Sequence, residues 1–406
     1  MKGRFQIMEY QEDVIKELPE ISEDHLNSIR YPSLQQPRLE NIEFLRITSM
    51  IMVISLHFLG HGGILSSVPF FSFNYFMSWT IESLAYVAVN CYVLISGYFS
   101  IKNKFTLKKI IMLYLQILFY SVVIYLALSL SGMINFNLQS LLYSFLPVST
   151  RGYWFATTFI ALYLLSPFLN YAINSMKKQQ LLLFIATLLF LFSIIPNLVF
   201  FEDGFSVNGG LSLYWFVCLY AIASYFRLYY IPSYKNTKWI VAYLIFSVLL
   251  ILSRIVISEL SLIVLGEIKG AGLFFTYNSI IVLPASVFMF LTFLNWKLPK
   301  LKSSKTLLFL SSSTFGIYLI HDNKYLREIL WNEILTPYAY VDKLYLVLYM
   351  LCCVLAIFFV SLFIERIRQI IFSPLQKSQW FSNLCLLITQ KFEKLIDRIS
   401  KLGEKT

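Results

Sequence analysis

Apolar segments of about twenty residues recur along the chain and constrain its fold more than any other feature. A bilayer core of about 30 Å requires roughly 20 mostly apolar residues per helix. Ten segments meet this requirement: 43–60, 76–100, 110–132, 153–173, 181–201, 211–226, 239–258, 273–294, 306–322 and 343–365. The sequence therefore predicts an all-α, polytopic membrane helix bundle with about ten transmembrane helices.

The composition excludes the soluble classes of protein. Hydrophobic residues make up 58% of the 406 residues and charged residues 14%, against roughly 45–50% and about 25% in soluble domains. So few charged side chains cannot cover the outside of a soluble protein, which excludes disordered, collagen-like and nucleic-acid-binding proteins. The net charge of +11 then reflects membrane topology. The five cysteines lack zinc-type spacing, and we expect no metal.

The distribution of lysine and arginine among the loops predicts the orientation of the bundle. Loops 102–109, 174–180, 227–238 and 295–305 carry thirteen of these residues, whereas the alternate loops carry five. Basic residues accumulate in the cytoplasmic loops of membrane proteins. We therefore expect a multi-pass protein of the cell membrane with both termini in the cytoplasm.

Polar segments flank the membrane part. Residues 1–40 are expected to form a polar, acidic cytoplasmic tail, and residues 41–370 the ten-helix domain. Within residues 371–406 an apolar stripe recurs at spacings of three or four, with basic residues mostly off it: Ile388, Phe392, Leu395, Ile399 and Leu402. This pattern predicts a basic amphipathic helix on the lipids of the anionic inner leaflet. A coiled-coil contact with a partner is the alternative.

Arg46 and His57 are the clearest ionisable residues within a predicted membrane helix. They are eleven positions apart, which at about 100° per residue places both side chains on one helix face, separated by a rise of about 16.5 Å. Such residues are expensive in lipid and are candidates for function. Alternatively, Arg46 snorkels to the interface and His57 is a hydrogen-bonded packing residue.

Further ionisable residues are expected toward the outer side of the membrane. His321 and Asp322 end the ninth segment, and His61 and Arg151 are expected at the same level. Glu82 and Arg254 lie within predicted helices, where they form an ion pair or line a polar cavity.

Four motifs occur in the order found in one known family. They are the Arg-x10-His spacing of Arg46 and His57, CYVLISGYF at 91–99, YWFATTFIALYLLSPFLN at 153–170 and GIYLIH at 316–321. Together, over about residues 39–369, they resemble the membrane acyltransferase family 3, integral membrane enzymes that modify bacterial cell-surface glycans. Without a fused extracytoplasmic domain, the chain resembles the Gram-positive capsule and exopolysaccharide branch most.

The resemblance implies an O-acetyltransferase that moves acetyl from cytoplasmic acetyl-CoA to a hydroxyl of a cell-surface polysaccharide or its lipid-linked precursor. His57 would be the general base, and Arg46 and His321 would complete the catalytic group. Arg46 would also bind the donor's anionic end together with a lysine loop: Lys104, Lys108 and Lys109. The acceptor would contact Glu82, Ser96, Arg151, Tyr153 and Trp154.

Two departures from the family pattern affect these expectations. Asn90 stands where many relatives carry an acidic residue, and the lysine loop replaces an Arg-x-x-Arg motif. Lysine keeps the positive charge but loses bidentate phosphate recognition.

Three alternatives remain open from the sequence. Ser96 is a candidate nucleophile for a covalent acetyl intermediate, although no base is placed for it. A ten-helix bundle with intramembrane charges also fits a transporter or flippase for a glycan or small anionic solute, although no inverted repeat is visible. A scaffold in a glycan assembly complex, held by the C-terminal helix, is the third.

Overall fold

A computed structural model describes residues 39–150, 152–233, 237–297 and 304–403. The predicted N-terminal tail lies almost entirely outside the described residues. Within them the chain is helical and contains no strand. The α-helices are α3 (Glu40–Gly60), α4 (Ile64–Ser67), α5 (Phe73–Ala85), α6 (Ala88–Ser100), α7 (Leu107–Leu130), α8 (Leu138–Phe145), α9 (Trp154–Ser175), α10 (Lys178–Leu189), α11 (Ile195–Leu198), α12 (Leu213–Tyr229), α13 (Lys238–Leu265), α14 (Val282–Leu294), α15 (Ser304–His321), α16 (Lys324–Ile329), α17 (Leu346–Lys377) and α18 (Gln379–Gly403).

Seven helical stretches in the described residues are long and apolar enough to cross a membrane. They are Glu40–Ser67, Phe73–Ser100, Leu107–Leu130, Trp154–Ser175, Lys178–Leu198, Lys238–Leu265 and Leu346–Lys377. The other three predicted segments fall on α12, α14 and α15. Helices α12 and α14 are shorter, and the apolar sequence of the continuous helix α15 contains the polar run 311–314. The prediction of a polytopic membrane bundle is confirmed.

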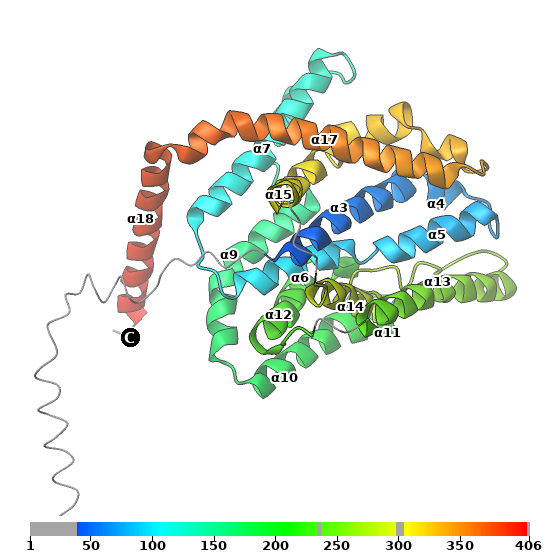
Figure 1. The fold of residues 1–406 in the computed structure, drawn as a ribbon, viewed down its shortest axis with the longest axis horizontal. Coiled ribbons are helices and arrows are strands. Elements are labelled where there is room, and N and C mark those ends of the chain that lie inside the picture. Colours follow the sequence, from blue (N-terminus) through cyan, green and yellow to red (C-terminus); the bar gives the residue numbers. More distant parts are fainter. Residues whose placement is uncertain (1–38, 151, 234–236, 298–303, 404–406) are drawn as a thin grey trace, which may run out of the picture. The chain divides into compact units, whose positions relative to one another are not determined.

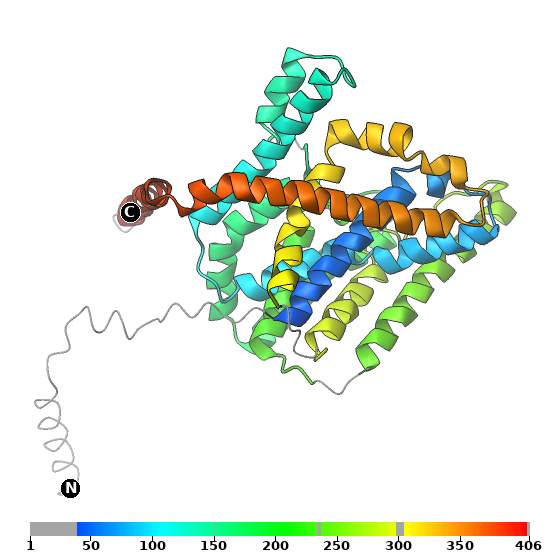
Figure 2. The same ribbon diagram turned by 45° about the horizontal axis from the view of Figure 1, so that its top comes forward.

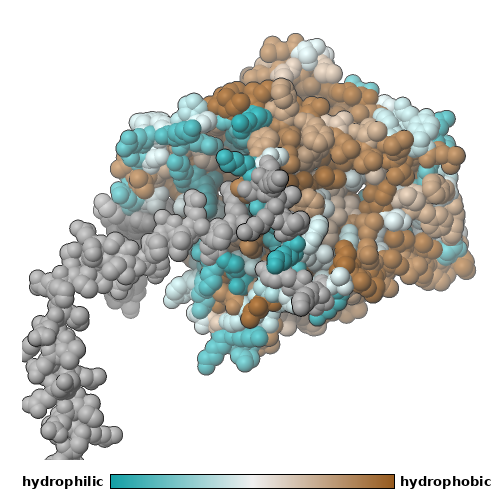
Figure 3. Space-filling view, viewed as in Figure 1, coloured by the Kyte–Doolittle hydropathy of each residue, from teal (hydrophilic) through white to brown (hydrophobic). Residues whose placement is uncertain are grey.

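Helix α3 lies at the centre of the bundle and packs against α5, α6, α14, α15 and α17 (Figures 1 and 2). Its apolar side chains Ile54 and Phe58 are fully buried. The peripheral helices α7, α10 and α13 instead expose many large aliphatic side chains. On the face seen in Figure 3 the surface over α13 and α17 is broadly apolar, and hydrophilic residues gather toward α18. This arrangement suits a lipid environment.

The predicted eighth span, 273–294, is wrong in its first part, because α14 begins only at Val282. Residues 266–281 form turns that start at two glycines with positive φ, Gly266 and Gly270. Asn90 donates to the carbonyl of Tyr277, and Ser193 to that of Asn278. Non-helical backbone is tolerated at membrane depth where protein groups satisfy it in this way.

Two other predicted spans differ from the observed helices. The second is broken between α5 and α6, around Tyr86 and Val87. The last continues to Lys377 instead of ending at residue 365, because Glu365 and Arg368 are buried against neighbouring helices rather than placed at a helix end. The predicted C-terminal helix is present as α18, which contacts α7. Its contact with lipid stays a prediction.

Candidate active site

A cavity of about 300 Å³ lies beside α3 and is enclosed by residues of α6, α7, α9 and α15. Arg46 and His57 both line it, as the eleven-residue spacing predicts. Arg46 lies near the N-terminal end of α3, where it pairs with Glu43 at 2.9 Å. His57 lies near the C-terminal end. The cavity therefore connects the two residues of the Arg-x10-His spacing.

His57 and His321 contact each other directly. Nδ1 of His57 lies 3.0 Å from Nε2 of His321, and Nδ1 of His321 lies 2.6 Å from the carbonyl oxygen of Ile317. A carbonyl only accepts, so His321 Nδ1 carries a proton and, with neutral rings, His321 Nε2 accepts from His57 Nδ1. The proton positions thus follow from the partners, and they leave Nε2 of His57 as its basic nitrogen.

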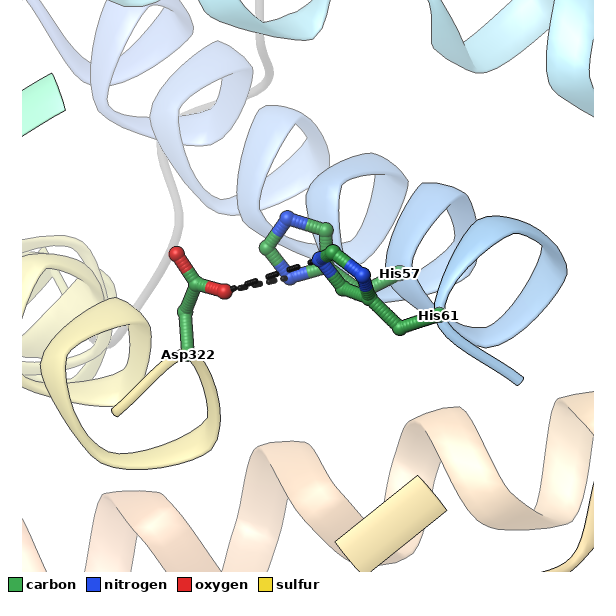
Figure 4. A group of neighbouring side chains, drawn as sticks. All are labelled: His57, His61 and Asp322. Carbon is green, nitrogen blue, oxygen red and sulfur yellow. Dashed lines mark ion pairs between the residues drawn. The ribbon is translucent and has the colours of Figure 1, made fainter. Parts of the chain in front are cut away.

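Asp322 is the carboxylate closest to the two histidines of α3 and its following turn (Figure 4). Its Oδ1 lies 3.8 Å from His57 Nδ1 and 3.8 Å from His61 Nε2, and the side chain is 2% exposed. Arg327 Nε lies 3.0 Å from the same oxygen. A buried carboxylate at this position attracts positive charge on His57, and the Arg327 guanidinium paired with it opposes that charge.

The same three groups satisfy the spacing of a metal site. Ligand atoms of His57, His61 and Asp322 all lie within 4.8 Å of one another. However, Arg327 contacts the Asp322 oxygen, and His57 Nδ1 bonds to His321. A divalent ion would have to displace both of these partners. The arrangement therefore favours an acid–base group over a metal centre.

Two of the predicted acceptor residues line the cavity and one does not. Ser96 and Trp154 line it. The hydroxyl of Ser96 donates to the Tyr92 carbonyl at 2.8 Å. Tyr153 is buried beside the cavity, where it donates to the Leu319 carbonyl and accepts from Asn323. It therefore holds the end of α15 that carries His321.

Glu82, another of the predicted acceptor residues, is not brought to the cavity. Glu82 is buried between α5 and α13 and is absent from the cavity lining. The guanidinium of Arg254 lies 3.3 Å from the ring centre of Trp79, so its main neighbour is an aromatic face. Sequence spacing cannot tell a cavity-lining position from one behind the first layer of helices. Arg151 lies outside the described residues.

The lysine loop also lies away from the described cavity lining. Lys108 Nζ donates to the carbonyl of Gln376 and the hydroxyl of Ser382, and it lies 5.9 Å from the ring centre of Phe381. It thus ties α7 to the segment where α17 ends and α18 begins. Lys109 is exposed, and the role of Lys104 stays a prediction.

Asn90, the first departure from the family pattern, is fully buried. Its Nδ2 donates to the Tyr277 carbonyl at 2.9 Å and to Ser286 Oγ at 3.1 Å, and its Oδ1 accepts from Trp215 Nε1 at 3.0 Å. A carboxylate cannot donate the first two bonds. The amide of Asn90 therefore supplies a donor to the non-helical turn before α14, which a carboxylate could not do.

Several residues of the site carry no sequence signal of their own. Gln116 and Tyr277 line the cavity, yet amides and polar aromatics recur throughout the chain. Asp322 is adjacent to His321 in the sequence, and this adjacency was the one available clue to its role.

Comparison with protein families matches residues 39–366 to the family described as the acyltransferase domain of acyltransferase family 3. The chain belongs to this family. An acyltransferase 3 protein is an integral membrane enzyme of acyl transfer, which agrees with the apolar helices and the cavity lined by Arg46 and His57. Neither a curated protein nor a solved structure gives a significant match to the chain.

Proposed function

We propose that this acyltransferase 3 protein transfers acetyl from cytoplasmic acetyl-CoA to a hydroxyl of a cell-surface polysaccharide or its lipid-linked precursor. The observation that carries the proposal is the cavity joining Arg46 to the contact between His57 and His321. A polysaccharide acceptor of the capsule or exopolysaccharide kind follows from the sequence resemblance.

The chemistry assigns one proton transfer to His57. Its Nε2 takes the proton of the acceptor hydroxyl while the oxygen attacks the thioester carbonyl carbon. A C–O bond forms, the C–S bond breaks, and the sulfur leaves as a thiolate that accepts the proton from His57. Nε2 of His321 accepts a hydrogen bond from His57 Nδ1 and so fixes the tautomer of His57. Asp322 stabilises the transient imidazolium of His57.

Direct transfer is favoured over a covalent intermediate on Ser96. The Ser96 hydroxyl donates to a main-chain carbonyl, and no histidine or carboxylate is bonded to it in the described residues. Incubation of purified protein with acetyl-CoA and no acceptor tests this point. A base-labile acetyl group on the protein would contradict direct transfer.

In the orientation proposed from the loop charges, the donor and the acceptor reach opposite ends of the cavity. Arg46 lies at the cytoplasmic end, where the donor enters, and His57 at the far end, where the acceptor hydroxyl arrives. Both termini are then cytoplasmic, and α18 lies against the inner leaflet.

The test compares two substitutions on α3 in purified protein. His57→Gln removes the base and should lower kcat/KM for acetyl transfer by about 10²–10⁴-fold. Thr48→Ala, which removes a hydroxyl bonded to the Phe44 carbonyl of its own helix, should leave activity unchanged. Equal activity of the two variants would contradict the role of His57. A wild-type protein that transports a glycan but transfers no acetyl would contradict the proposed function.

A further inference from the structure

A second hollow of about 650 Å³ lies where α15 and α17 meet α7. Its wall is polar and charged, with Gln116, Ser312, Glu365, Arg366, Arg368 and Gln376 among the lining residues. None of the sequence expectations placed a site here. The hollow is large enough for part of a nucleotide-sized ligand.

The hollow adjoins the catalytic cavity. Gln116 of α7 and Ser312 of α15 line both spaces. From Ser312 to His321 the chain rises nine residues along α15, about 13.5 Å. A thin, extended chain can therefore run from the hollow, between Gln116 and Ser312, to the histidine pair.

A buried ion pair forms the floor of the hollow. Glu365 accepts from Arg368 Nε at 2.9 Å and Nη2 at 2.6 Å. It also accepts from Tyr120 at 2.6 Å and from Gln116 at 3.3 Å. Helix α15 approaches this carboxylate so closely at Gly316 that an added Cβ would clash with Glu365 Oε2. Helices α15 and α17 thus pack closely around the Glu365–Arg368 pair.

The charges lining the hollow favour an anion. Glu365 and Arg368 pair with each other and their charges cancel, which leaves the Arg366 guanidinium as the excess positive charge of the lining. Arg366 is exposed, with its guanidinium 5.1 Å from the ring centre of Phe309. Lys108 adds a cation at the rim through its bond to the Gln376 carbonyl. Guanidinium groups bind phosphate in a bidentate manner that lysine cannot match.

We propose that this hollow binds the phosphate-bearing end of the acyl-CoA donor and that the acyl arm enters the catalytic cavity between Gln116 and Ser312. The inference rests on the proposed function and locates its donor. It assigns to Arg366, beside the Glu365–Arg368 pair, the phosphate contact that the sequence assigned to the lysine loop.

The experiment measures donor binding and transfer in the purified, full-length protein with three probes. The probes are CoA, 3′-dephospho-CoA and S-acetylpantetheine, which lacks phosphate. Arg366→Gln should weaken CoA binding about tenfold, with a smaller effect on 3′-dephospho-CoA and none on S-acetylpantetheine. Lys177→Gln is the matched control, because Lys177 is an exposed cation outside the lining of the hollow.

A second variant tests the passage without removing a charge. Ser312→Leu narrows the opening shared by the two spaces, so CoA should still bind with unchanged affinity while acetyl transfer falls at least tenfold. Thr48→Ala, at a position outside both linings, should keep both.

The outcomes separate the inference from the function on which it rests. If the wild type transfers acetyl and Arg366→Gln matches Lys177→Gln in CoA affinity and donor KM, the inference is overturned and the function stands. If the wild type neither binds CoA nor transfers acetyl, both are overturned. Selective loss of CoA affinity in Arg366→Gln supports the inference.

Discussion

The Glu365–Arg368 pair allows a quantitative prediction that does not depend on the enzyme's substrate. Both side chains are buried, Glu365 at 1% exposure and Arg368 at 6%, and two hydrogen bonds join them. Removing one partner of such a pair leaves an uncompensated buried charge, which costs about 3–5 kcal/mol. We therefore expect Arg368→Met to lower the free energy of unfolding by this amount.

The double variant separates the pair from its surroundings. Glu365→Gln keeps oxygen and shape, so Tyr120 can still donate to it. The double variant, Glu365→Gln with Arg368→Met, leaves no charge at the buried pair. Its loss of unfolding free energy should be smaller than the sum of the two single losses by about 2–3 kcal/mol.

Reversible unfolding in mixed detergent and SDS micelles, followed by tryptophan fluorescence, measures these free energies. Phe363, which is exposed two residues before Glu365 on α17, provides the control through Phe363→Leu, with an expected change below about 0.5 kcal/mol. If the costs of the Glu365 and Arg368 changes simply add, the buried pair is not coupled and the reasoning fails.

Three further predictions follow from close contacts. Gly316→Ala places a methyl group against Glu365 and should destabilise the protein by about 1–3 kcal/mol in the same unfolding assay; an unchanged midpoint would contradict this. Asn90→Asp loses two donated bonds and should cost about 2–4 kcal/mol, whereas Asn90→Gln tests shape alone. His321→Gln, which keeps an acceptor for His57 Nδ1, should retain at least tenfold more transfer activity than His321→Ala, and equal rates would refute the tautomer assignment.

The membrane architecture could be predicted from the sequence because it depends on local apolar length. All ten predicted segments fall on helices. The errors arise where tertiary contacts replace a local rule. Residues 273–281 are apolar enough for a helix, yet side chains such as Asn90 bond their carbonyls in a turn. The charged residues after 364 resemble the end of a span, yet Glu365 and Arg368 are buried together and α17 continues.

The candidate site was predictable only along a single helix. The spacing of Arg46 and His57 fixes a shared face, and both line the cavity. The contact between His57 and His321 spans 264 positions, so only the family resemblance pointed to it. Hydropathy could not predict the position of Glu82, because a carboxylate in an apolar segment indicates polar surroundings but does not specify which cavity, if any, it lines. The hollow at Arg366 depends on packing between α15 and α17, which no local pattern encodes.

Proton NMR of purified surface glycan tests the central claim most directly. Three strains are compared. One expresses the wild-type protein, one expresses His57→Gln at an equal amount of protein in the membrane, and one lacks the protein. The account predicts base-labile acetyl signals with the wild type and their loss in both other strains, with glycan still exported. Equal acetylation in all three strains, or loss of glycan export itself, would contradict it.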